Sequence, residues 1–274
     1  MDNLFPAPPG ETSFVAIGDS FTEGLNDAAP GGGYRGWADR LAGMMAVEYP
    51  ELRYANLAVR GRLLRQIVAE QVPAAVALSP GLVSIAGGGN DIIRPGGDPD
   101  TLAELLDAAV ARLRATGCRV LLFTGADLVG FPVMRLLRGR IAAYNMHLRS
   151  IADERGCDLV DLWSMRFLRE LSAWSPDRLH LTSASHQRVA LRTAEVLGLP
   201  VDEDWRDDLP LSPLSPWRPS AGRDDWLAAR RQDARWVREY LAPWVGRRLH
   251  GVSSGDGRTA KRPELTPVSP RILM

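Results

Sequence analysis

The sequence predicts an α/β fold in which helices cover both faces of a parallel sheet, because short apolar runs alternate with amphipathic stretches. The amphipathic stretches carry apolar residues at spacings of three and four, as one face of a helix does. The apolar runs have the length of buried strands. Five such runs are present, at Phe14–Ile17, Leu52–Val59, Leu82–Ala86, Arg119–Thr124 and Cys157–Leu162.

Helices are expected between and after these strands. The clearest one begins at Thr101, which fits a capping box with Glu104, and it ends before Gly117. The segment 125–137 after the fourth strand is unusually apolar for a loop, and we expect it to overhang the carboxyl edge of the sheet. Other helices are expected over residues 34–47, 63–72, 141–154 and 183–197.

The first strand runs directly into Gly18, Asp19 and Ser20. A glycine allows a sharp turn there, and the carboxyl ends of parallel strands are where ligands bind in α/β sheets. Aspartate and serine are also favoured helix caps, so a strand, a turn and a cap explain this stretch equally well when it is taken alone.

Three later motifs favour a catalytic role for this turn. Residues 56–61 read NLAVRG, residues 88–91 read GGND and residues 177–180 read DRLH. Together with GDSF at residues 18–21, these motifs stand in the order of the sequence blocks of the SGNH or GDSL-type serine hydrolases. The chain resembles this family over about residues 12–198. Phe21 replaces the leucine of the family's GDSL motif. The resemblance implies a flavodoxin-like, three-layer α/β/α sandwich with a parallel sheet of about five strands.

The resemblance also implies a catalytic serine, histidine and aspartate. Ser20 is the implied nucleophile, His180 is the base that takes its proton, and Asp177 orients the imidazole. A carboxylate three residues before a histidine can fold back onto it within one turn. His186 falls inside a predicted helix and is a poorer candidate for the base.

The oxyanion hole that the family uses maps onto the backbone N–H groups of Ser20 and Gly61 and the side chain of Asn90. All three residues follow predicted strands, so they are expected to meet at one edge of the sheet. Asp19 and Asp91 are expected to bond loop backbone rather than to take part in the chemistry.

Several other kinds of site are excluded by the sequence. The GxSxG motif of the α/β-hydrolases is absent, because Thr22 stands where the final glycine would be. No GK[ST] sequence occurs, and residues 31–36 match GxGxxG without directly following a strand. No cluster of Cys and His has metal-ligand spacing, and serine catalysis requires no cofactor, so neither a metal nor a cofactor is expected.

The composition changes after Pro200, which predicts a hydrolase domain over residues 1–200 and a C-terminal extension over residues 201–274. The extension is predicted to contain a linker rich in Pro and Ser, a helix over Trp226–Trp244 that docks through its tryptophans, and a disordered tail after Gly246.

Charge and hydropathy bound the partners and the location. The chain has 33 basic and 33 acidic residues, so its net charge favours neither nucleic acid nor an acidic polymer as a partner. The N-terminus lacks the features of a secretory signal and no apolar run has the length of a membrane span, which predicts a cytoplasmic protein without integral membrane contact. The expected partner is a small-molecule ester, and the oligomeric state is not predicted.

The motifs together predict a serine esterase or acylhydrolase that forms an acyl-enzyme. Two alternatives stay open. One is an O-deacetylase that acts on carbohydrates or small molecules with the same site. The other is a catalytically silent binding module on the same fold, against which the presence of all five site residues argues.

Overall fold

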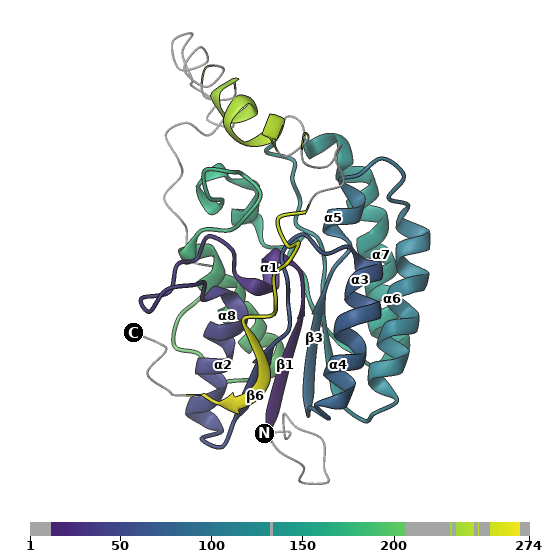
Figure 1. Ribbon diagram of the computed structural model, residues 1–274, viewed down its shortest axis with the longest axis vertical. Helices are drawn as coiled ribbons and strands as arrows, with labels where there is room; N and C mark the ends of the chain where they lie inside the picture. The colour runs from purple at the N-terminus through teal and green to yellow at the C-terminus, as the bar shows by residue number, and fades with distance from the viewer. Residues whose placement is uncertain are drawn as a thin grey trace.

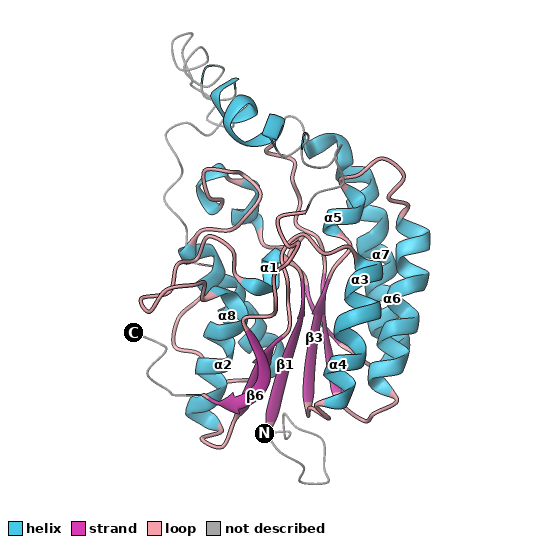
Figure 2. Ribbon diagram, in the orientation of Figure 1, coloured by secondary structure: helices cyan, strands magenta, loops and turns pink. Residues whose placement is uncertain are grey.

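A computed structural model describes residues 12–131, 134–206, 231, 234–243, 246 and 253–268. Within these ranges the chain forms three layers, with a six-stranded sheet between two layers of helices (Figures 1 and 2). The strand order is β5-β4-β3-β1-β2-β6. The first five strands are parallel and β6 is antiparallel to β2. The predicted α/β/α fold is therefore confirmed, and one strand is added to it.

The bounds of the elements follow the predicted alternation. The strands are β1 (Ser13–Gly18), β2 (Arg53–Asn56), β3 (Leu82–Ala86), β4 (Arg119–Phe123), β5 (Asp158–Val160) and β6 (Arg262–Pro267). The α-helices are α1 (Ser20–Glu23), α2 (Gly36–Glu48), α3 (Leu64–Gln66), α4 (Val72–Ala77), α5 (Gly89–Ile92), α6 (Pro99–Arg114), α7 (Arg138–Arg155) and α8 (Ser183–Leu197). Shorter helical turns are η1 (Ile67–Gln71), η2 (Met134–Leu137), η3 (Arg166–Arg169), η4 (Leu171–Ala173) and η5 (Val237–Leu241). None of the helices in the described ranges is long and apolar enough to cross a membrane.

Strand β1 lies at the centre of the sheet, and its side chains are buried on both faces. Phe14 and Ala16 pack in a core under α2 and α8, whereas Val15 and Ile17 pack in a second core under α3, α4, α6 and α7. Successive side chains of a strand point to opposite faces, so an uninterrupted apolar run is what a sheet covered on both faces requires.

Several predicted helices have bounds that differ from expectation, and α7, for example, begins at Arg138 rather than at Ile141. Helix α6 begins at Pro99 rather than at Thr101, because the Asp98 carboxylate accepts a hydrogen bond from the N–H of Thr101 (2.9 Å) and Pro99 is suited to the first turn. The helix expected over residues 63–72 continues to Ala77 through the π-helical turn η1.

The tail expected to be disordered after Gly246 is ordered over residues 253–268, and this prediction was wrong. Strand β6 pairs with the edge strand β2, and Leu265 and Val268 are buried against the two cores. The tail is polar in composition, but the unpaired edge of β2 supplies backbone partners that composition does not show.

The remaining predictions for the extension have mixed outcomes. The expected linker at residues 209–219 lies outside the described residues, and the domain boundary at residue 200 stays a prediction. Of the helix expected over Trp226–Trp244, residues 234–243 are described and are helical, with Trp236 buried.

Lys261, the only lysine of the chain, joins this tail to the first two helices. Its ammonium donates to the backbone carbonyls of Glu23 (2.6 Å), Tyr34 (3.0 Å) and Arg35 (3.0 Å), and it forms an ion pair with Asp39 (2.5 Å). A compact cation with several donors suits such a cluster of carbonyl groups.

The docking of β6 predicts that Leu265→Ala lowers the free energy of unfolding by about 2–3 kcal/mol, at the lower end of the range for a buried leucine. The control is Glu264→Ala at the preceding, exposed position, for which we expect a change within about 0.5 kcal/mol. Denaturant unfolding of both variants measures this difference. Equal stability of the two variants would contradict the strand.

Candidate active site

The site is built around a tight turn at Gly18, where β1 ends. A Cβ atom on Gly18 would lie 2.5 Å from the carbonyl oxygen of Ala86 and 2.7 Å from Oγ1 of Thr22, so only glycine fits. The side-chain amide of Gln71 accepts from the N–H of Gly18 (2.7 Å) and donates to its carbonyl (2.9 Å). This pair of bonds fixes the point from which the chain enters α1 and places Ser20 at its first residue.

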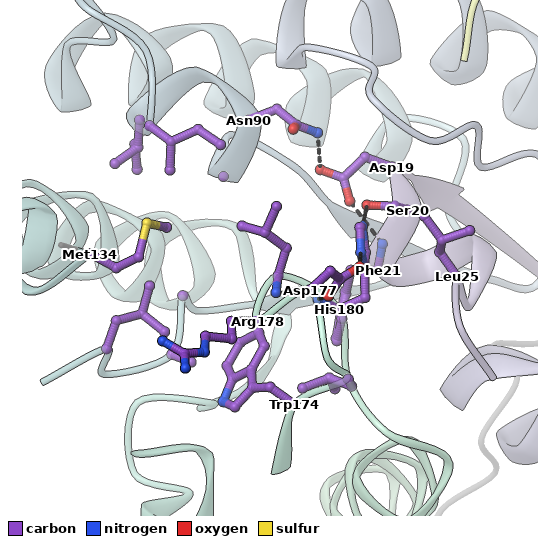
Figure 3. Close-up of a pocket in the computed structure, with 18 of the residues that line it drawn as sticks. Asp19, Ser20, Phe21, Leu25, Asn90, Met134, Trp174, Asp177, Arg178 and His180 are labelled. Carbon is purple, nitrogen blue, oxygen red and sulfur yellow. Dashed lines mark hydrogen bonds and ion pairs between the residues drawn. The ribbon is translucent and has the colours of Figure 1, made fainter. Parts of the chain in front are cut away.

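Ser20, His180 and Asp177 form a continuous chain of hydrogen bonds (Figure 3). Oγ of Ser20 lies 3.0 Å from Nε2 of His180, and Nδ1 of His180 lies 2.7 Å from Oδ2 of Asp177. The structure thus brings together residues that are 160 positions apart in the sequence. A serine, an imidazole and a carboxylate in this order have the geometry of an activated nucleophile with its base and orienting group.

The fold of the DRLH segment explains the orientation of Asp177. Its Oδ1 accepts hydrogen bonds from the backbone N–H groups of Leu179 (3.0 Å) and His180 (3.1 Å). Arg178 adopts a left-handed conformation with φ of 56°, which closes this turn. Burial acts to raise the pKa of Asp177, but hydrogen bonds and the charge of His180 outweigh it and hold the pKa below its ordinary value.

Asn26 is a further contact of Asp177 that sequence reasoning missed. Its side-chain amide donates to Oδ2 of Asp177 at 2.8 Å. Asn26 has φ of 72°, a left-handed conformation that asparagine tolerates better than most residues. It opens the loop rich in Gly and Pro after α1, and nothing in the sequence pattern of that loop points to Asp177.

A buried ion pair links α1, the helix that begins at Ser20, to the residue before Gly61. The Glu23 carboxylate of α1 pairs with the guanidinium of Arg60 and accepts from its backbone N–H (2.7 Å). Gly61 follows with φ of 73°, and it lines the same cavity as Ser20. Among the described residues, no hydrogen bond uses the backbone N–H of Ser20 or of Gly61.

Asn90 lies in α5, directly after β3, and its amide points toward Asp19 (Figure 3). Its Nδ2 donates to Oδ2 of Asp19 at 2.9 Å and to the carbonyl oxygen of Arg62 at 3.1 Å. The amide has two hydrogens, so both are already engaged. Donation by Asn90 to a substrate oxygen requires one of these bonds to be exchanged, and its place in the oxyanion hole stays a prediction.

Asp19 and Asp91 bond backbone N–H groups, as predicted, but in the first turns of α1 and α3 rather than in loops. Asp19 accepts from the N–H of Phe21 (3.0 Å), and Asp91 accepts from the N–H of Leu64 (3.0 Å). Burial raises the pKa of Asp19 to about 6, although the bond from Phe21 and the charge of His180 oppose this shift.

His186 also borders the cavity, but its surroundings differ from those of His180. Its Nδ1 accepts a hydrogen bond from the backbone N–H of Trp37 (3.2 Å), and the ring is buried. Burial lowers the pKa of His186 to about 3, so the ring stays neutral at ordinary pH.

A cavity of about 550 Å³ opens at the carboxyl edge of the sheet, with Ser20, Asn90 and His180 among its lining residues. Figure 3 shows Met134 across the cavity from Ser20. Leu128 and Met134 line the cavity, which confirms that the segment after β4 overhangs the site. Residues 132 and 133 of this segment lie outside the described residues. Other apolar lining residues are Leu25, Ile92, Ile93, Ile141, Leu162, Leu168 and Leu179.

No group of three or more His, Cys, Asp and Glu side chains is arranged to hold a metal ion in the part of the chain that the structure describes.

A model of the GDSL-like Lipase/Acylhydrolase family matches residues 16–188, which is more than half of the chain. The chain belongs to this family. The match contains all five residues predicted for the site and ends before the C-terminal extension. A search of curated protein sequences gave no match.

Solved structures of similar fold include two enzymes. LAE5, an alpha/beta hydrolase enzyme from the metagenome of Lake Arreo in Spain, is 25% identical with a TM-score of 0.60, over 69% of this chain and 95% of its own. Axe2, an acetylxylan esterase from Geobacillus stearothermophilus, is 24% identical with a TM-score of 0.59, over 72% of this chain and 96% of its own. These likenesses support the three-layer fold.

The burial of Asp19 predicts that its carboxyl carbon titrates with a midpoint near pH 6 in a ¹³C NMR experiment, with Asp19→Asn used to assign the signal. The native pKa lies above the unfolded value of about 3.9. The contribution of Asp19 to stability is therefore full below about pH 4 and is lost as the pH rises through 6. Exposed Asp98, whose pKa is lowered by hydrogen bonds from Thr101, is the internal control. A midpoint for Asp19 at or below 4 contradicts its burial.

Proposed function

We propose that this chain hydrolyses carboxylic esters through an acyl-enzyme formed on Ser20. Membership of the lipase/acylhydrolase family supports ester hydrolysis. The observation that carries the assignment of residues is the hydrogen-bond chain from Asp177 through His180 to Ser20, at the mouth of a cavity.

In the first half of the reaction, Nε2 of His180 takes the proton of the Ser20 hydroxyl as Oγ attacks the ester carbonyl carbon. The charge that develops on the carbonyl oxygen is received by the N–H groups of Ser20 and Gly61, with Asn90 as a third donor once its amide is released. Asp177 stabilises the imidazolium. The tetrahedral intermediate collapses, the leaving alcohol takes the proton from His180, and the acyl group stays on Oγ.

In the second half, a water molecule replaces the alcohol. His180 takes a proton from water, the resulting hydroxide attacks the acyl carbon, and the same donors receive the oxyanion. Collapse of this intermediate breaks the bond to Oγ, and His180 returns the proton to Ser20. The products are the carboxylic acid and the alcohol, and no redox step or cofactor is required.

O-deacetylation is an alternative that uses the same residues on an acetyl ester. Axe2 is described as an acetylxylan esterase. Its sequence identity of 24% to this chain supports a shared fold and no shared activity. A silent binding module is the alternative outside enzymes. Release of acid from p-nitrophenyl esters distinguishes catalysis from binding.

The nucleophile is tested by labelling with an organophosphonate followed by peptide mass spectrometry. We expect one label, on Ser20, because His180 activates this hydroxyl. Ser20→Ala should abolish both the label and ester hydrolysis. Ser254→Ala is the matched control, since Ser254 lines the same cavity without contacting His180, and it should be labelled as the wild type is. A label on another serine, or wild-type rates in Ser20→Ala, would overturn the assignment.

The orienting groups are tested by comparing Asp177→Asn with Asn26→Ala. Asp177→Asn should lower kcat by about 10⁴-fold, because the imidazole is then held in the wrong tautomer. Asn26→Ala removes one of the four hydrogen bonds that described residues make to the Asp177 carboxylate and should lower kcat by about 2–10-fold, the value of one hydrogen bond. Steady-state kinetics on p-nitrophenyl acetate measures both. A larger loss for Asn26→Ala than for Asp177→Asn is incompatible with these roles.

A further inference from the structure

Part of the cavity wall comes from the C-terminal extension, outside the region that the family shares. Glu239, Tyr240 and Pro243 of the helical residues 234–243 line the same cavity as Ser20, and Ser254 lines it from the following described segment. In Figure 1 the yellow-green helix lies beyond the carboxyl ends of the strands. All four residues follow the end of the family match at residue 188.

The helix is anchored to the loop that carries the catalytic aspartate and histidine. Trp236 is buried, and its indole N–H donates to the carbonyl oxygen of Asp177 at 2.8 Å. The guanidinium of Arg178 lies 5.1 Å from the centre of the Trp236 ring. A buried indole with its N–H bonded and a cation on its face holds this helix against the Asp177–His180 turn.

A second anchor lies against the proposed oxyanion loop. Oγ of Ser253 donates to the carbonyl oxygen of Gly61 (3.4 Å), and a Cβ atom on Gly61 would lie 2.2 Å from that Oγ. A Cβ atom on Gly255 would lie 1.9 Å from the carbonyl oxygen of Arg60, so the two backbones are in close contact. The pairing of β6 with β2 and the ion pair of Lys261 hold the rest of this segment. The extension therefore contacts both sides of the catalytic centre.

The chemistry of the cavity lining indicates which substrates the cavity accepts. Tyr240 and Pro243 share the cavity with Leu128, Met134 and Ile93, so apolar groups from the extension, from the segment after β4 and from the end of α5 line it. Arg178 is stacked on Trp236, and the Glu239 side chain is 45% exposed. A small neutral molecule with an apolar group suits this mainly apolar lining, whereas the hydroxyl groups of a polysaccharide would lose hydrogen bonds to water against it.

We propose that the C-terminal extension determines substrate specificity, with Tyr240 as a residue that contacts the apolar group of the substrate. The substrates are small, neutral esters with a large apolar group, and acetylated polysaccharides are excluded. This inference rests on the proposed ester hydrolysis at Ser20 and goes beyond it by naming the class of ester.

The test compares wild type, Tyr240→Ala, Tyr240→Phe and Val237→Ala on p-nitrophenyl acetate and p-nitrophenyl hexanoate. Val237 is the matched control, because it lies on the same helix, is 40% exposed and is not among the cavity-lining residues. We expect wild type to prefer the hexanoate. Tyr240→Ala should lower the hexanoate-to-acetate ratio of kcat/KM about three- to tenfold, mainly through KM, because an aromatic contact made equally in the ground and transition states is lost. Tyr240→Phe and Val237→Ala should keep the wild-type ratio within twofold.

The outcomes separate this inference from the proposed function. Thermal denaturation first establishes that Tyr240→Ala is folded. If wild type hydrolyses both esters and this variant keeps the wild-type hexanoate-to-acetate ratio of kcat/KM, Tyr240 does not contact the substrate and the inference is wrong. Faster release of acetate from acetylated xylo-oligosaccharides than of hexanoate from p-nitrophenyl hexanoate overturns the substrate class. Hydrolysis of no ester by wild type, with Ser20 unlabelled by the phosphonate, refutes the proposed function instead.

Discussion

The site depends on the close approach of three backbone segments at the end of β1. Gly18 passes so near to Ala86 of β3 and to Thr22 of α1 that no side chain fits, and Gln71 bonds both polar groups of its backbone. This fixed turn determines the direction in which α1 begins. The turn therefore positions Ser20 independently of His180, and nucleophilic catalysis requires such a defined position.

The other parts of the site are linked to the same short helix. Glu23, at the end of α1, holds the backbone and the guanidinium of Arg60, and its own carbonyl accepts from Lys261 of the tail. Asn56 donates to the carbonyl oxygen of Thr22 and so joins the end of β2 to α1. Helix α1 thus connects the proposed nucleophile, the proposed oxyanion loop and the C-terminal extension, and a change at one of them is expected to be felt at the others.

The sequence predicted what periodicity and local motifs determine. The strands and most helices followed from apolar runs and spacing, and the DRLH motif predicted a local pairing that the structure contains, because a carboxylate can bond the backbone and the ring of a histidine three residues later. Helix α6 began earlier than predicted because Asp98 and Pro99 form a better start than the capping box at Thr101.

What the sequence could not predict depends on contacts between distant segments. The contact of Asn26 with Asp177 spans 151 positions, and that of Gln71 with Gly18 spans 53, with no motif to mark either. Strand β6 was missed because its pattern is polar and its stability comes from the edge of β2 and from two buried residues, Leu265 and Val268. Tyr240 lines the cavity from a helix that Trp236 docks four residues earlier, and no sequence motif marks this contact.

In the proposed reaction, Ser20 attacks the ester and the N–H groups of Ser20 and Gly61 receive the oxyanion. A crystal structure of the protein after reaction with an organophosphonate tests it most directly, because the tetrahedral phosphorus adduct resembles the intermediate. We expect phosphorus bonded to Oγ of Ser20, with one phosphonyl oxygen about 3 Å from the backbone nitrogens of Ser20 and Gly61. A phosphonyl oxygen directed away from both nitrogens, with other donors around it, would contradict these roles.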